Sequence, residues 1–181
     1  MVASAPAAFI RRAFFLLCTL GLAGSEAFAV RLPGPDVPAL LRVNSMTRTS
    51  FGPAVQEDHR QTLISRGGGV LELLATAGPS GSGAFFIRAF QGLGTSGELA
   101  TLGQALVEGR IGTLDDCTIG GNPGHMEITW YGRTGRQNTF RVTYRPGGAP
   151  PGIPQCSAAA VNIVGAIERF VIDAESHLPQ E

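Results

Sequence analysis

Short strand-like segments with apolar residues recur along the first half of the chain and are separated by polar or glycine-rich stretches. The first four segments are Met46–Phe51, His59–Ser65, Val70–Ala75 and Ala84–Phe90. They are separated by the polar loop Gly52–Asp58, by three consecutive glycines at 67–69 and by a Pro/Ser/Gly run at 79–83. Short runs separated by such clusters predict an antiparallel meander.

The clearest strand signal is the hairpin Met126–Tyr144, in which apolar and polar residues alternate on both sides of a turn. Gly135 closes the three-residue loop 133–135, and we expect it to be left-handed and part of a bulge. The resulting register pairs Ile128 with Phe140 and Met126 with Val142. The large apolar side chains of the hairpin would then share one face.

Two other segments repeat apolar residues at helical spacing. The first is Gly97–Glu108, for which Ser96 is the expected N-cap and Gly109 the expected left-handed stop. Gly103 lies in its apolar face and predicts close packing on a sheet. The second helix is expected over 157–176, with a serine as its candidate cap. Its apolar stripe is unbroken and consists of Ala160, Ile163, Val164, Ile167, Phe170, Val171 and Ala174.

The order of strands, helix, hairpin and helix predicts an α+β fold, with two helices packed on one face of an antiparallel sheet. We expect this single domain over residues 45–176. A Pro-rich leader would precede it over 30–44, and a short C-terminal tail would follow at 177–181.

The first 29 residues have the features of a signal peptide. Arg11 and Arg12 form a short basic region, Ala13–Ala23 is mostly apolar, and Ala27 and Ala29 stand at the two positions that a signal peptidase reads. We therefore expect cleavage after residue 29 and export to the periplasm or the extracellular medium. The apolar run is shorter than the roughly 20 residues of a spanning helix, so no stable membrane insertion is expected. An uncleaved anchor is the alternative.

Composition and charge exclude two classes of protein. The 181 residues include 14 basic residues, all of them Arg, and 14 acidic ones, and 44% are hydrophobic. This chain is too apolar to be disordered. Removing 1–29 takes away two Arg and one Glu, which leaves 12 Arg, 13 acids and a net charge of −1. We expect no nucleic-acid partner, because no basic arm or stripe is present, and we expect a monomer.

Two cysteines, Cys117 and Cys156, remain after the expected cleavage, since Cys18 lies in the removed segment. An even pair in an exported chain predicts a disulfide bond. A two-thiolate metal site is the competing interpretation, but no histidine or third cysteine lies at ligand spacing. We therefore expect neither a metal nor a cofactor.

Catalytic motifs are missing from the sequence, which favours a binding protein over an enzyme. Gly78–Ser82 lacks the last glycine of a nucleophile elbow, and the three glycines at 67–69 do not open a helix as a phosphate loop would. The three histidines are scattered. The alternative class is a small secreted hydrolase that would use Asp115, Asp116 or His125.

A candidate partner surface surrounds the turn of the hairpin. Tyr131, Arg133 and Arg136 combine an aromatic ring with guanidinium groups, a composition that is enriched in the hot spots of protein interfaces. The alternative is an ordinary solvated face of a sheet.

From Met46 to Glu175 the chain resembles emfourin-type proteins, small bacterial inhibitors of thermolysin-type metallopeptidases, and related exported domains of unknown function. The resemblance consists of the turn-forming stretch Arg48–Gly52, a helix with Leu99 and Leu102, the Gly135-Arg136 turn, and a closing amphipathic helix after a Pro-rich link. It implies inhibition by loops that occupy the cleft of a protease. Ser50, Phe51 and Gly52 are the matching positions.

The sequence therefore predicts an exported binding domain without enzymatic activity and with a protein partner. The resemblance implies that this partner is a metallopeptidase. A structural component of the cell envelope is a further alternative, beside the secreted hydrolase.

Overall fold

The structure, a computed structural model, describes residues 39–51, 54–78 and 85–177. The expected signal peptide, its cleavage site and the first part of the expected leader lie outside these ranges, as do Gly52 and the end of the C-terminal tail. Within the described ranges, no helix is both long and apolar enough to cross a membrane.

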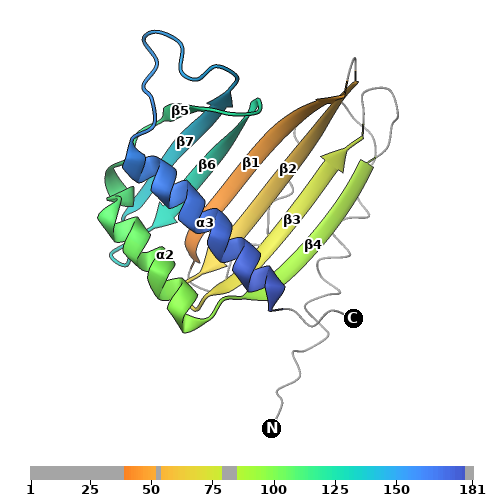
Figure 1. Ribbon diagram of the computed structural model, residues 1–181. Helices are drawn as coiled ribbons and strands as arrows, with labels where there is room; N and C mark the ends of the chain where they lie inside the picture. The colour runs from red at the N-terminus through yellow and green to blue at the C-terminus, as the bar shows by residue number, and fades with distance from the viewer. Residues whose placement is uncertain (1–38, 52–53, 79–84, 178–181) are drawn as a thin grey trace. The chain divides into compact units, whose positions relative to one another are not determined.

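The described residues form seven strands and two α-helices (Figure 1). The strands are β1 (Ala39–Phe51), β2 (Ala54–Ser65), β3 (Gly69–Ala77), β4 (Phe85–Leu93), β5 (Cys117–Gly120), β6 (Gly124–Tyr131) and β7 (Gln137–Arg145). The helices are α2 (Ser96–Glu108), α3 (Ala158–Ser176) and the short 3-10 helix η1 (Ile111–Thr113).

All seven strands belong to one sheet, in the order β4-β3-β2-β1-β6-β7-β5. The sheet is mixed, which corrects the expectation of a purely antiparallel one: β5 runs parallel to β7, whereas the other neighbours are antiparallel. β5 was not predicted from the sequence, because its four residues are too few to show an alternating pattern.

Tertiary contacts hold β5 in place. Cys117, at its start, forms a disulfide bond with Cys156 at the entrance to α3, as the cysteine count predicted. Beside this bond, the amide of Thr118 donates to the carbonyl of Pro154 (2.9 Å), and the amide of Cys156 donates to the carbonyl of Thr118 (3.0 Å). The segment before α3 therefore pairs with β5 through one parallel bridge, between Gln155 and Thr118, on the outer side of this edge strand.

β1 and β2 are longer than their hydrophobic patterns indicate. Residues 39–44, assigned by sequence to the leader, form the first half of β1, and residues 54–58, assigned to a loop, begin β2. In the outer half of β2, Gln56 and Asp58 alternate with Glu57 and His59, so both faces are polar and the strand has no apolar periodicity there.

The hairpin prediction is confirmed in its register and its turn. Ile128 pairs with Phe140 and Met126 with Val142, and all four side chains are buried in the core. Gly135 has a φ of 76°, the left-handed conformation that the three-residue loop requires.

Helix α2 begins one residue earlier than expected and has a different cap. Thr95, not Ser96, is the N-cap: its hydroxyl accepts from the amide of Glu98, whose carboxylate accepts from the amide of Thr95. At the other end Gly109 has a right-handed φ of −78°, and the left-handed residue is Arg110. Gly103 does not pack closely, since a Cβ there would meet open space.

Helix α3 forms as predicted, with Ser157 as its N-cap and the whole apolar stripe buried. Its C-terminal end lies directly on the edge strand β4. A Cβ at Gly92 would come within 2.6 Å of the carbonyl oxygen of Ala174, so only glycine permits this close approach.

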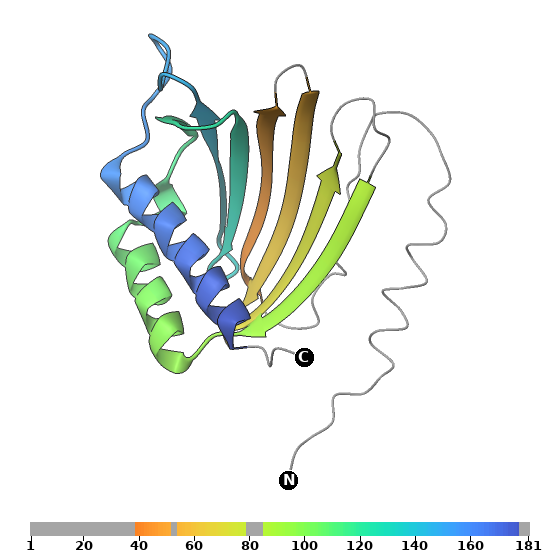
Figure 2. The same cartoon turned by 45° about the vertical axis from the view of Figure 1, so that its right-hand side comes forward.

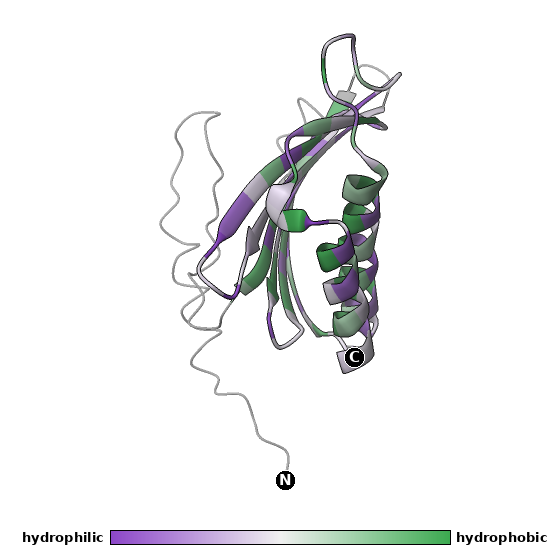
Figure 3. Ribbon diagram, turned by 90° about the vertical axis from the view of Figure 1, so that its left-hand side faces the viewer, coloured by the Kyte–Doolittle hydropathy of each residue, from purple (hydrophilic) through white to green (hydrophobic). Residues whose placement is uncertain are grey.

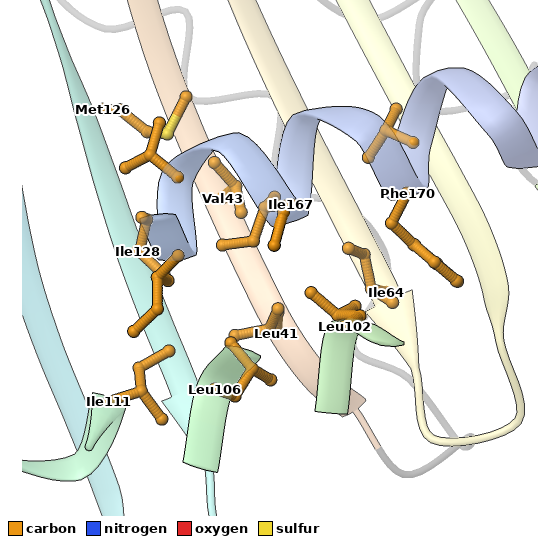
Figure 4. Packing of buried hydrophobic residues seen from close by; sticks show 14 of the residues in the cluster. Leu41, Val43, Ile64, Leu102, Leu106, Ile111, Met126, Ile128, Ile167 and Phe170 are labelled. Atoms are coloured by element: carbon orange, nitrogen blue, oxygen red, sulfur yellow. The ribbon is translucent and has the colours of Figure 1, made fainter. Parts of the chain in front are cut away.

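Both helices lie on the same side of the curved sheet (Figures 2 and 3). The side chains of Leu102 and Leu106 extend from α2 toward Leu41 and Ile64 on the sheet (Figure 4). These four residues belong to one buried cluster together with the apolar stripe of α3. The core thus occupies the part of the sheet that the helices cover.

Candidate functional site

The helices leave part of the sheet uncovered. In Figure 1, α3 crosses the strands diagonally, and the ends of β1 to β4 near the β1–β2 turn extend beyond it. A cavity of about 660 Å³ lies on this face, between the open part of the sheet and α3. Its volume is in the range of small-molecule binding sites. We refer to it as the concave cleft.

The concave cleft has one apolar wall and one polar floor. Ile167 and Val171 of α3 form the wall, while Leu74, Val43 and Met126 add apolar patches to the floor. The polar floor residues come mainly from alternate positions of β2 and its neighbours: Ser45, Thr47, Gln56, Asp58, Arg60, Thr62, Glu72 and Thr76.

Glu72 provides a buried carboxylate at the floor. Its side chain is only 2% exposed, and it accepts a hydrogen bond from the Thr62 hydroxyl across the β2–β3 pair at 3.0 Å. Nε of Arg60 lies 3.4 Å from the other carboxylate oxygen. Burying a carboxylate destabilises the folded state unless the group is paired with a cation and hydrogen-bonded. Arg60 provides the ion pair and Thr62 the hydrogen bond.

The Asp58 carboxylate also has hydrogen-bond donors, and it lies nearer than Thr62 to the Phe51–Ala54 end of the β1–β2 pair. Its carboxylate accepts from the hydroxyl of Thr76 at 2.7 Å and from the side-chain amide of Gln56 at 3.2 Å. Both acidic groups of the β2–β3 floor are therefore already engaged by the protein.

Arg88 and Phe86 stand at the mouth of the cleft on the edge strand β4. The aromatic ring of Phe86 is 60% exposed. The Arg88 guanidinium has no ion pair or side-chain hydrogen bond with any residue that the structure describes. An unengaged cation thus lies beside an exposed aromatic ring.

The opposite end of the cleft is formed by Tyr144 and Glu168. Burial, and after it the negative charge of Glu168, raises the pKa of Tyr144 to about 12. The Tyr144 hydroxyl is buried and makes no hydrogen bond to the described part of the chain. This end therefore combines a neutral hydroxyl with a carboxylate.

Glu175, one turn beyond Val171 on α3, interacts with the charges of Glu72 and Arg60 on the floor. Burial raises its pKa, and the negative charge of Glu72 raises it further, while Arg60 acts in the opposite direction. One of its carboxylate oxygens is buried without a hydrogen bond from any described group. The two carboxylates thus share a single neighbouring guanidinium.

The residues singled out by the resemblance lie away from the cleft's interior. Ser50 is exposed, and pairing between β1 and β2 continues to Phe51 and Ala54. Gly52 falls outside the described residues, and nothing is described of the Phe51 side chain. Ser50 and Phe51 therefore stand at the end of two long paired strands.

The Tyr131 group lies at the other end of the sheet. Leu41 pairs with Trp130, so Tyr131 is roughly 30 Å along β1 from Ser50. Arg133 and Arg136 are exposed in the hairpin turn beside it. The structure does not bring the two groups of candidate partner-binding residues together.

The three candidates for a hydrolase site, Asp115, Asp116 and His125, do not form a common site in the described structure. The Asp116 carboxylate accepts from the amide of Arg141 at 2.7 Å, and Asp115 is exposed. Burial lowers the pKa of His125, and Arg141 and then Glu127 are the charges that act most on it; neither aspartate is among its causes. No group of three or more His, Cys, Asp or Glu within the described ranges could hold a metal ion.

Among the residues that line the cleft, His125 was a sequence-predicted candidate, for a hydrolase site, and the charged and hydroxyl side chains of the floor were not predicted. One signal was present: Glu72 is the single charge in the apolar run Val70–Ala75, a position where a buried carboxylate needs a partner. The partner itself could not be recognised, because Thr62 is ten residues away and reaches Glu72 only through strand pairing.

Comparison with known proteins identifies no family. No family model matches the sequence, and no curated protein matches it.

Proposed function

We propose that this chain is an exported binding domain and that the concave cleft takes up a small amphipathic molecule. The observation that carries the proposal is the cleft itself: about 660 Å³ between the apolar wall of α3 and a floor of polar side chains on β2 and β3. An amphipathic ligand matches both surfaces, because its apolar part removes hydrophobic area from water and its polar part finds hydrogen-bonding partners.

The disulfide bond between Cys117 and Cys156 supports the exported part of the proposal. Structural disulfides persist in oxidising compartments and are rare in the cytosol. The basic and apolar segments near the start of the chain agree with this assignment.

A test of the proposal compares two leucines that are adjacent in β3. Leu74 lines the cleft, whereas Leu73 points to the other face of the sheet. Leu74→Trp would place a bulky indole ring in the middle of the cleft floor, and Leu73→Trp is the matched control. Binding of decanol and decanoate below their micellar concentrations would be followed by NMR shifts of backbone amides.

We expect shifts confined to the cleft strands and α3, lost in Leu74→Trp and retained in Leu73→Trp. The proposal is wrong if neither compound binds, or if the shifts lie on the opposite face of the sheet and survive Leu74→Trp.

A second candidate function is inhibition of a peptidase by the end of the β1–β2 hairpin. The observation in its favour is that strand pairing extends to Phe51 and Ala54, which gives a stiff projection at the positions that the emfourin resemblance selects. The test is an inhibition assay against metallo-, serine and cysteine peptidases. Tight inhibition that is lost in Ser50→Arg would support this role. If none of the peptidases is inhibited, the inhibitor role is wrong.

A further inference from the structure

Some charged side chains of the concave cleft already have hydrogen-bond or ion-pair partners within the protein, and one does not. Asp58 accepts hydrogen bonds from Thr76 and Gln56, and the Glu72 carboxylate is held by Thr62 and Arg60. Arg88 is the cleft cation with no such partner in the described part of the chain. The mouth of the cleft therefore has an unused positive charge.

The register of the sheet shows what lies inward from that charge. Arg88 pairs with Leu74, Leu74 with Arg60, Arg60 with Ser45, and Ser45 with Met126. Four strand spacings separate Arg88 from Met126, a distance of about 19 Å. This row crosses the cleft from the edge strand β4 to β6.

Most of this row can contact a hydrocarbon chain. Leu74 and Met126 are apolar, and the guanidinium of Arg60 is turned toward Glu72, which leaves its methylene stem over the floor. Ile167 and Val171 of α3 line the cleft as its opposite wall. An extended alkyl chain on this path would have apolar contacts on two sides.

The two ends of the cleft have opposite charges. Arg88 stands on β4 at one end, whereas Glu168, an exposed residue of α3 beside Tyr144, lies at the other. An anionic group is attracted to the first position and repelled from the second. A single free guanidinium matches a singly charged carboxylate, which it can bind with two parallel hydrogen bonds.

We propose that the ligand of the concave cleft is a long-chain carboxylate, with its head group on Arg88 and its alkyl chain across Leu74 toward Met126 beneath α3. This inference rests on the proposed function and adds the charge of the head group and the direction of the chain. The exposed ring of Phe86, two residues from Arg88 on the same face of β4, lies beside the first part of this path.

Isothermal titration calorimetry on the full chain tests the inference with four compounds: decanoate, decanol, decylammonium and decyl phosphate. We expect decanoate to bind about tenfold more tightly than decanol, as a charge-assisted hydrogen bond predicts. Arg88→Gln should remove this advantage, and Arg88→Glu should make decylammonium the preferred ligand. Arg110→Gln, which changes an exposed arginine between α2 and η1 outside the cleft, is the control and should change nothing.

The titrations distinguish a wrong head-group assignment from a wrong proposed function. Equal affinity for decanol and decanoate, or a preference for decylammonium in the unaltered chain, would overturn the head-group assignment while the cleft remained a binding site. Tighter, Arg88-dependent binding of decyl phosphate would replace the carboxylate by a phosphate head. If none of the four compounds binds, the proposed function fails as well.

Discussion

The Thr62 hydroxyl donates a hydrogen bond to the Glu72 carboxylate across β2 and β3, at 3.0 Å and with both side chains almost excluded from solvent. This pair lies at the boundary between the apolar core and the concave cleft. It allows a charged group to remain in the sheet where the helices end and the polar floor begins.

Thr62→Val is expected to lower the free energy of unfolding by about 1–3 kcal/mol, because it leaves a buried carboxylate without one of its donors. Urea unfolding at neutral pH measures the effect. Thr47→Val, on the same face but exposed, is the control and should stay within about 0.5 kcal/mol of the unaltered protein. Equal stability of the two variants would contradict a stabilising role for the Thr62–Glu72 bond.

Glu175→Gln is expected to raise the melting temperature at neutral pH. Burial and the charge of Glu72 raise the Glu175 pKa above its ordinary value of 4.5. The unfolded chain therefore loses its proton more easily than the folded one, and ionisation destabilises the fold as the pH rises above that value. The gain should disappear in acid, where the carboxyl group is protonated in both states.

Thermal unfolding at several pH values measures this difference. Asp173→Asn, an exposed carboxylate in the last turns of the same helix, controls for the unfavourable interaction of any negative charge with the end of a helix. A pH-independent effect of Glu175→Gln, or one no larger than that of Asp173→Asn, would contradict the assigned cause.

Thr95→Ala and Ser96→Ala distinguish the observed cap of α2 from the one that the sequence suggested. Thr95→Ala removes a side-chain cap and should cost about 1 kcal/mol. Ser96→Ala should change stability little, because the capping hydrogen bonds are made by Thr95 and Glu98. Chemical denaturation of both variants provides the comparison, and a larger loss in Ser96→Ala would show that the cap is misassigned.

Replacement of Cys117 and Cys156 by serine should lower the free energy of unfolding by about 4 kcal/mol in the chain-entropy model, for cysteines 39 positions apart. In the unreduced protein, mass spectrometry after alkylation should find both cysteines unmodified, and reduction should make both reactive. Alkylation before reduction would show that the bond is absent in solution.

The sequence predicted best those elements whose stability comes from neighbours in the chain. Helix α3 has an unbroken apolar stripe, and the β6–β7 hairpin combines strict alternation with a turn glycine. The prediction failed where a strand has polar residues on both faces, as at Gln56 and Asp58, and where a strand is as short as β5. Such strands form because neighbouring strands provide their hydrogen-bond partners, and a local pattern contains no information about these neighbours.

By itself the sequence determined the class of the fold, the hairpin register, the position of the last helix and the pairing of Cys117 with Cys156, because each follows from local periodicity or from the number of cysteines. Only the tertiary structure decided that the sheet is mixed and that Arg60, Glu72 and Arg88 line one cleft. The physical reason is that strand order and sheet curvature bring together side chains from different strands. α3, in turn, covers only part of the face on which they lie.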